Sequence, residues 1–319
     1  MATANTVQTV ERDVDYQGHQ FLPKTKILHW GRWVTAAVII ILLIALIYAG
    51  SKGQIEYGKI PGIIVDPVIT DAVIRTIILA VVAQVGAILI GIVIALMRIS
   101  KNPVARVFSW VYIWIFRGLP TLLQIMLWYN MALVFPRVTI AIPFTGLVIF
   151  DQSTNVLMTA FMASLLGLGL NESAYMAEIV RAGLNSVDKG QREAAQSIGM
   201  KPGMMMRRVI LPQAMRVIIP PTGNDFINML KGTSMASVIG FSELIHASNS
   251  LSSYSLLIME TLIAAAFWYM VIVSVANVGQ YFLERKYNPA GVQQSEGLFK
   301  KIVTSLKTPP ALLRKGDRR

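Results

Sequence analysis

The sequence predicts an all-α integral membrane protein with about six transmembrane helices. Hydrophobic residues make up 54% of the 319 residues and charged residues only 14%, which is more apolar than a soluble domain usually is. Several apolar runs approach the roughly 20 residues that a helix needs to cross a bilayer. The basic residues lie between these runs rather than within them. With no cysteine, a disulfide framework, a thiolate nucleophile and a thiolate zinc site are excluded.

The first predicted span is Val34 to Ala49, which reads VTAAVIIILLIALIYA. It follows Lys24, Lys26 and Arg32 and an interfacial Trp33, an arrangement typical of a membrane helix. The segment before it is too long for a signal peptide, and no small-x-small cleavage site follows, so we expect the helix to be retained. Four more spans are predicted at about 71–97, 111–135, 156–180 and 260–283.

A sixth span is predicted from topology, because five crossings would place two basic chain ends on opposite sides of the membrane. The only interval with room for it is 213–259, where the segment at about 217–241 is apolar but interrupted. Its interrupting residues are Pro220, Pro221, Asn224, Asp225, Asn228 and Lys231. We therefore expect a polar, broken span here.

The basic residues support six spans with both termini in the cytoplasm. Lys and Arg are concentrated before span 1, at 98–117, at 181–216 and after 283, whereas four fall outside, namely Lys52, Lys59, Arg75 and Arg137. This bias is the one that positive charge imposes on cytoplasmic loops. The expected organisation is a cytoplasmic segment at 1–33, a helix and outer loop at 34–67, a core at 68–287 and a basic cytoplasmic tail at 288–319.

The largest cytoplasmic loop, at 186–213, has signals for two short helices. Asp188 can cap the first, with Gln191 at capping-box spacing, and Gly199 can end it in a left-handed conformation. Lys201 and Pro202 then open a second helix, which Pro212 is expected to close. Small alanines on the first helix would let another protein's groove approach closely.

Within this loop, GQREAAQSIGMKPGMMMRRVILPQ resembles the EAA loop of the permease subunits of ATP-binding-cassette importers. The residues in register with that pattern are Glu193, Ala194, Ala195, Gly199, Ile210, Leu211 and Pro212. FRGLPTLLQ at 116–124, LNESAYMAEIVRAGLNSV at 170–187 and PPTGNDFINMLKGTSMASVIG at 220–240 are similar to the polar amino acid branch of that family. Several motifs in the right order are far more specific than any one of them.

The resemblance implies a five-helix importer-type permease core with one extra N-terminal helix, in a bacterial cell membrane. It implies an ATPase subunit docked on the EAA loop, a binding protein that delivers polar amino acids from outside, and a second permease copy, with a homodimer favoured over a heterodimer. ATP and magnesium would be used by the ATPase, so no cofactor is expected in this chain. Gly232 departs from the pattern, since the branch usually has an acidic residue after the lysine.

Other function classes fit the sequence less well. GQIEYGK at 53–59 matches a phosphate-binding loop until Ile60 replaces the required Ser or Thr, so it is not an ATP site. The three histidines are far apart, and neither a metal site, a catalytic constellation nor nucleic-acid binding is indicated. A secondary transporter would work without any ATPase, and a membrane scaffold would leave the polar sixth span unexplained.

Polar residues inside spans are candidates for function, because a charge in hydrocarbon costs at least about 2.5 to 3.5 kcal/mol and faces a cavity or partner. Asn224, Asn228 and Lys231 share a helical face, which we interpret as the lining of a translocation pathway. The alternative for Lys231 is an ion pair with Asp225 or Glu178.

The remaining intramembrane features have structural interpretations. Glu178 and Arg181 are predicted to pair locally, and Arg117 is predicted to snorkel to the cytoplasmic surface. A stripe of small residues in the second span is predicted to pack closely on a neighbouring helix, and it consists of Ala83, Ala87, Gly91 and Ala95.

Overall fold

The computed structural model describes residues 30–142 and 147–287, which fall into two units. The described part of the first unit is helix α1 (Trp30–Ser51) and the turn after it. This helix is long and apolar enough to cross a membrane, which confirms the helix predicted at 34–49. The predictions for 1–29 and 288–319 lie outside the described residues.

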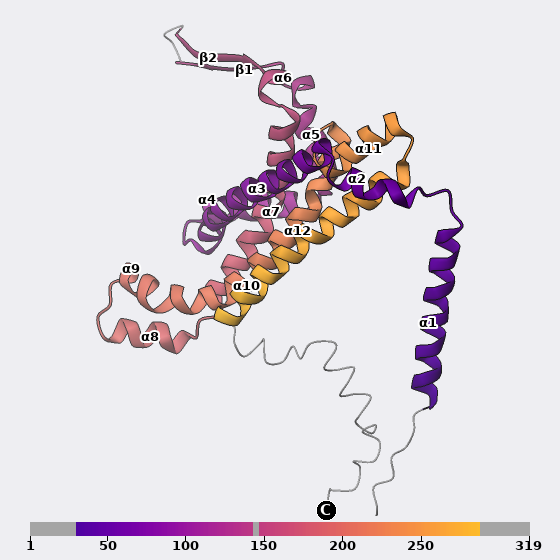
Figure 1. Cartoon of the computed structure of the whole chain (residues 1–319). Helices are drawn as coiled ribbons and strands as arrows, with labels where there is room; N and C mark the ends of the chain where they lie inside the picture. The colour runs from indigo at the N-terminus through magenta and orange to yellow at the C-terminus, as the bar shows by residue number, and fades with distance from the viewer. Residues whose placement is uncertain (1–29, 143–146, 288–319) are drawn as a thin grey trace, which may run out of the picture. The chain divides into compact units, whose positions relative to one another are not determined.

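The second unit begins at Gln54 and contains every other described element (Figure 1). Its first half comprises η1 (Tyr57–Lys59), α2 (Ile60–Ile64), α3 (Pro67–Ile99), α4 (Pro103–Gly118), α5 (Thr121–Tyr129), η2 (Met131–Leu133), β1 (Arg137–Ala141), β2 (Val148–Ser153) and α6 (Thr154–Leu157). Its second half comprises α7 (Ala160–Asn185), α8 (Lys189–Ser197), α9 (Pro202–Met205), η3 (Met206–Ile210), α10 (Leu211–Gly232), η4 (Thr233–Ile239), α11 (Leu244–Ser255) and α12 (Ile258–Tyr287).

The third predicted span, at 111–135, is wrong as a continuous helix. The chain here forms α4 and α5, which are bent by 101° relative to each other. The break falls at Leu119 and Pro120, both of which have extended ψ angles. Proline lacks a backbone N–H and pushes the residue before it out of the helical region, so α4 ends where the sequence places Leu-Pro.

Two strands follow, which the helical prediction did not include. β1 and β2 form an antiparallel hairpin in which Arg137 pairs with Ser153 and Ile140 with Phe150. Arg137 contacts the Asp151 carboxylate at 2.7 Å, and Thr139 donates to the same carboxylate at 2.9 Å. The Arg137 guanidinium and the Thr139 hydroxyl hold the pKa of the Asp151 carboxyl below its usual range. The fold nevertheless stays all-α in class, since the hairpin is a small addition to a helical bundle.

The predicted small-residue stripe of α3 packs against α7. Ala83, Ala87 and Ala95 are fully buried, and a Cβ atom added to Gly91 would lie 2.6 Å from the Cβ of Met176. The two backbones can come this close only because the stripe lacks larger side chains. The prediction of a helix-packing stripe is confirmed, and the structure identifies α7 as its partner.

The helix after the cytoplasmic loop corrects the role predicted for Pro212. This proline does not close the second helix: it lies in the first turn of α10, directly after η3 (Met206–Ile210), which is a π-helical segment, and the chain stays helical from α9 through η3 into α10. Pro220 and Pro221 lie inside α10, and Gln280 of α12 donates to the Pro220 carbonyl at 2.8 Å. The helix continues as η4 to Gly240, which is left-handed, with a φ angle of 79°.

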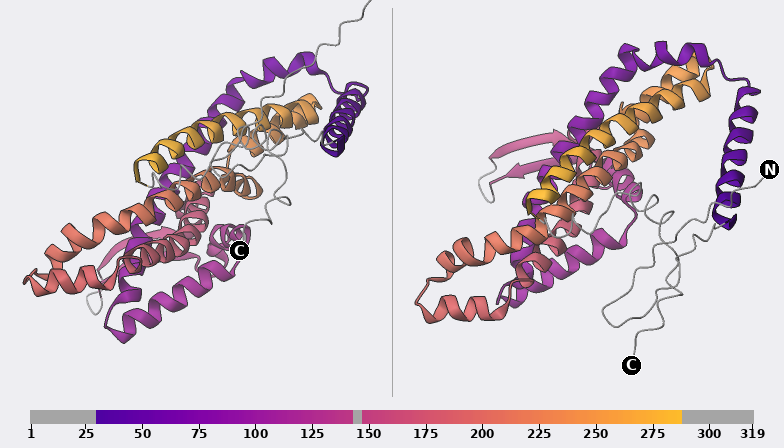
Figure 2. Two further views of the ribbon diagram at one scale, coloured as in Figure 1. Left: turned by 90° about the horizontal axis from the view of Figure 1, so that it is seen from below. Right: turned by 60° about the horizontal axis from the view of Figure 1, so that its bottom comes forward.

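Of the described helices, α1, α3 and α12 are individually long and apolar enough to cross a membrane, as is the bent pair of α4 and α5. The two other predicted spans fall on α7 and on α10 with η4, which are more polar. Helix α11 was not predicted, and Glu243 caps it by accepting bonds from Ile245 and His246. Helices α8 and α9 form an arm at one end of the second unit, whereas α2 and α11 lie toward its other end (Figures 1 and 2).

Candidate functional site

The arm formed by α8 and α9 is shaped by local sequence signals. The Asp188 side chain accepts a bond from the Gly190 N–H at 2.7 Å, which confirms the predicted cap. Gly199 has a φ angle of +75°, so the predicted left-handed bend is confirmed. Around it, the Gly199 N–H donates to Gln196 and the Met200 N–H to Ala195, which together form a Schellman motif. Lys201 and Pro202 open α9 as predicted.

The structure divides the EAA-like residues into two groups. Glu193, Ala194, Gly199 and Pro212 are exposed, and Leu211 is 40% exposed. Ala195 and Ile210 are buried within this chain, where Ile210 belongs to an apolar cluster at the base of the arm. Ile198, which the motif does not include, is 78% exposed beside the bend. The arm therefore presents an exposed surface around Glu193 and Ile198, whereas Ala195 and Ile210 pack within the chain.

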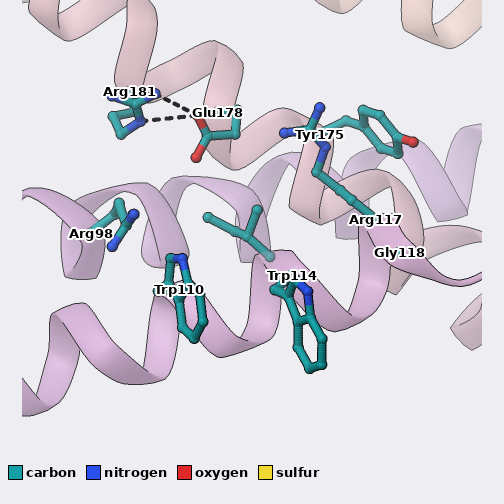
Figure 3. Close-up of a pocket in the computed structure, with 9 residues that line it drawn as sticks. Arg98, Trp110, Trp114, Arg117, Gly118, Tyr175, Glu178 and Arg181 are labelled. Carbon is teal, nitrogen blue, oxygen red and sulfur yellow. Dashed lines mark hydrogen bonds and ion pairs between the residues drawn. The ribbon is translucent and has the colours of Figure 1, made fainter.

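A cavity of about 510 Å³ lies where the end of α3, helix α4 and helix α7 meet (Figure 3). Its lining is basic and aromatic, and consists of Arg98, Trp110, Ile113, Trp114, Arg117, Gly118, Tyr175, Glu178 and Arg181. The two indole rings lie parallel along α4, with centroids 6.3 Å apart. Glu178 and Arg181 enter the cavity from α7.

Two charged groups in this cavity retain free bonding capacity. Arg181 donates twice to the same oxygen of Glu178, Oε2, at 2.6 and 3.0 Å, which confirms the predicted local pair. The other oxygen, Oε1, accepts no bond from the described residues. Arg117 lies over the ring of Tyr175 at 4.8 Å and makes no hydrogen bond or ion pair with them. Its predicted role as a residue that only reaches the membrane surface is incomplete, because it lines the cavity.

The polar face of α10 is exposed along its length. Asn224, Asn228 and Lys231 are all exposed, as their common spacing predicts for one open face. The alternative role for Lys231 finds no support in the described residues, where no ion pair includes it. Glu178 is paired with Arg181, and the carboxyl group of Asp225 lies near that of Glu172 on α7.

The contact between Glu172 and Asp225 was missed from the sequence. One oxygen of each carboxylate is buried without a hydrogen-bond partner among the described residues. The available signal was the presence of two acidic residues within predicted spans, but nothing local shows that they face each other across α7 and α10. Sequence reasoning likewise missed the cavity, because its lining comes from three separated segments.

Helix α7 connects the cavity to the polar face of α10. Glu172 contacts α10 through Asp225, and Glu178 lines the cavity. Tyr175 lies between them in sequence, and residues three apart on a helix are offset by only about 60° around its axis. Glu172, Tyr175 and Glu178 thus form a strip that winds from α10 to the cavity.

The sequence of this chain is similar to those of known transport proteins. Residues 87–289 match the family described as the inner membrane component of binding-protein-dependent transport systems. The arginine transport system permease protein ArgU of Corynebacterium glutamicum is 40% identical over 262 residues, which cover 81% of each chain. The L-cystine transport system permease protein TcyB of Bacillus subtilis is 35% identical over 222 residues, covering 69% of this chain and 86% of that protein.

The chain belongs to the amino acid ABC-transporter permeases. It is thus a transporter membrane subunit, like its relatives, and not an enzyme. A crystal structure of an amino acid ABC transporter with histidines has 36% sequence identity and a TM-score of 0.59, covering 69% of this chain and 94% of that one. A methionine transporter, MetNI, matches with a TM-score of 0.55 at 15% identity, which shows likeness of fold alone.

The family motifs of this permease converge on the polar face. The segment at 116–124 includes the bend between α4 and α5, and the segment at 170–187 covers the C-terminal part of α7 and the two residues after it. The segment at 220–240 forms the end of α10 and all of η4. Three segments that the sequence keeps apart thus supply part of the cavity lining, namely Arg117, Gly118, Tyr175, Glu178 and Arg181, and the exposed face of α10.

Proposed function

We propose that this permease moves polar amino acids inward from an extracytoplasmic binding protein, with ATP and magnesium used by separate ATPase subunits. The observation that carries the proposal is the exposed arm, whose left-handed bend at Gly199 fixes the angle between α8 and α9. Glu193 and Ile198 project from it without a partner in the described chain. Such a rigid projection can transmit closure of an ATPase to the membrane helices by a shift between populations.

A second copy of the permease, most simply an identical one, completes the pathway. Asn224, Asn228 and Lys231 are polar groups within a predicted span, and such groups face a water-filled cavity or a partner rather than lipid. One chain leaves this face open along α7 and α10. A partner that closes it would enclose a polar channel between the two copies.

The distribution of basic residues supports a cytoplasmic location for the arm and for both chain ends. Single cysteines at positions 58 and 197 of this cysteine-free chain test this orientation with a membrane-impermeant thiol reagent. In intact cells we expect labelling at 58 and none at 197, with both labelled after the membrane is opened. Labelling of position 197 in intact cells would show that the arm lies outside and that the proposed orientation is wrong.

Coupling is tested by a matched pair of glycine substitutions in the arm. Gly199→Val places a β-branched residue at a positive φ angle, which costs about 1 to 2 kcal/mol and redirects α9. Gly203→Val is the control, because its added Cβ meets nothing within 4 Å and its φ angle is negative. We expect Gly199→Val and Glu193→Lys to insert normally but to lose ATPase co-purification and ATP-dependent uptake. If Gly199→Val and Glu193→Lys both keep normal uptake and ATPase binding, the arm is not the docking site for the ATPase.

A further inference from the structure

The cavity between α4 and α7 holds groups of both charges that can form further hydrogen bonds. The Arg117 guanidinium is held against the Tyr175 ring, which leaves its N–H donors without a protein acceptor in the described chain. A guanidinium in this state binds a carboxylate with two parallel hydrogen bonds. Oε1 of Glu178 is an acceptor without a donor, because Arg181 bonds only to Oε2. The cavity thus offers one site for an anion and one for a cation.

We propose that this cavity is a binding station for the backbone end of the transported amino acid. The Arg117 guanidinium binds the α-carboxylate, and Oε1 of Glu178 accepts a hydrogen bond from the α-ammonium. The side chain lies toward the rings of Trp114 and Tyr175 at the rim. This assignment rests on the proposed transport function, and it names the groups that recognise the substrate.

The balance of charge makes the carboxylate the more strongly selected group. Three guanidinium groups and one carboxylate line the cavity, and the Glu178–Arg181 pair leaves Arg98 and Arg117 in excess. Arg98 makes only one long contact, at 3.5 Å, to the Arg106 carbonyl. Every amino acid carries the α-carboxylate, whatever its side chain. A station of this kind accepts different side chains and discriminates against amines that lack the carboxylate.

An anionic lipid headgroup is the alternative occupant, because basic pockets on the cytoplasmic side of membrane helices bind such groups. Two observations favour the amino acid. The lining includes a carboxylate with one oxygen, Oε1 of Glu178, that can accept a hydrogen bond from an ammonium, a group that a phosphate monoanion does not supply. The Glu172–Tyr175–Glu178 strip also joins the cavity to the polar face of α10, whereas a surface that faces lipid is apolar.

A cysteine reporter tests occupancy directly. Gly118 lines the cavity, and a Cβ atom added there meets nothing within 4 Å, so Gly118→Cys introduces a single thiol without crowding. The full-length permease in inside-out membrane vesicles is treated with a soluble thiol reagent, with L-arginine or L-glutamine added at increasing concentration. Each amino acid is paired with the amine that remains when its carboxylate is removed. Phe108→Cys is the control, because Phe108 is 57% exposed on α4 but does not line the cavity.

We expect an amino acid to slow labelling of Gly118→Cys but not of Phe108→Cys, and the matched amine to have little effect. Arg117→Gln should raise the half-protecting concentration about tenfold or more, because a doubly hydrogen-bonded charged contact is lost. Arg117→Lys, which keeps the charge but not the paired geometry, should fall between. Trp114→Cys serves as a second reporter if Gly118→Cys fails to insert.

Three results would overturn the proposal. The first is that no tested amino acid slows labelling of the reporter. The second is that recognition does not depend on the carboxylate and Arg117, which is shown if the amine protects as well as its amino acid or if protection is unchanged in Arg117→Gln. The third is protection that depends on phosphatidylglycerol rather than phosphatidylcholine vesicles and ignores amino acids, which would assign the cavity to lipid. Labelling requires no ATP, so a failure here with intact ATP-dependent uptake removes the station and leaves the transport function standing.

Discussion

The side of α7 that packs against α3 differs in composition from the side that carries polar residues. Toward α3, α7 meets alanines and Gly91 so closely that an added Cβ would lie 2.6 Å from the Cβ of Met176. Toward the open face, the same helix carries Glu172, Tyr175 and Glu178, none of which is fully buried. One side is specified by the absence of side-chain bulk and the other by the presence of polar groups.

This difference shows how stability and function are separated on one helix. Lipid is as apolar as leucine, so association of α3 with α7 depends on close packing rather than on burial of apolar surface from water. Polar groups on the other side cost free energy in hydrocarbon and are retained only where water, a second copy or a substrate meets them. Substitutions on the α3–α7 seam should therefore affect folding, and those on the open face should affect transport.

The largest effect is expected at the α3–α7 seam. Gly91→Leu forces Met176 and the α7 backbone apart, because its Cβ would also lie 3.0 Å from the Ser173 carbonyl oxygen. We expect the free energy of unfolding to fall by about 3 kcal/mol or more, with little folded protein in the membrane. Overpacking already costs about 1 to 3 kcal/mol where the surrounding residues can move. Membrane yield and thermal unfolding in detergent measure this.

Gly86→Leu is the control for this substitution, because it lies on the same helix and an added Cβ meets nothing within 4 Å. It should leave the yield and the unfolding temperature near those of the native chain. Equal loss in both variants would show that α3 tolerates no added bulk anywhere. The distinction between its packed and open sides would then be wrong.

A smaller effect, on transport alone, is expected on the open face. Lys231→Met removes the charge and keeps much of the side-chain length, and no ion pair with a described residue is broken. We expect a normally assembled permease with uptake reduced several-fold, because the pathway loses its positive group. Lys59→Met, which removes an exposed lysine paired with Glu56, should leave uptake unchanged.

The contrary outcomes for Lys231 are distinct. Poor assembly of Lys231→Met would show that the lysine pairs with a carboxylate after the second copy binds, since an unpaired buried charge is strongly destabilising. Normal assembly with normal uptake would remove Lys231 from the pathway altogether.

The sequence predicted those features whose causes are local. The Asp188 cap, the bend at Gly199 and the Glu178–Arg181 pair each depend on residues only a few positions apart, and all three are confirmed. The small-residue stripe was also predicted, but its partner α7 was not, because periodicity shows that a face is small and not what it contacts.

The errors arose where a residue has two meanings or where distant segments meet. Pro212 was predicted to end a helix, but the structure passes from η3 into α10 across it without leaving the helical conformation, because the π-helical segment precedes the proline. Pro120 ends α4 inside a run whose hydropathy is continuous. The cavity and the Glu172–Asp225 contact depend on how α4, α7 and α10 pack, which no local spacing encodes.

The smallest effect is expected where the packed side of α7 meets α4. The Tyr112 hydroxyl lies 2.6 Å from the Ser173 hydroxyl, which also donates to the Leu170 carbonyl at 2.7 Å. Tyr112→Phe keeps the ring and leaves Ser173 with its carbonyl partner. We therefore expect the free energy of unfolding to fall by about 1 kcal/mol or less and uptake to stay normal. Tyr175→Phe, on the open side, should leave the unfolding temperature unchanged, because no hydrogen bond of its hydroxyl to a described residue is lost. A larger loss of stability at Tyr175 than at Tyr112 would mean that the second copy packs on the open face as tightly as α3 packs on the seam.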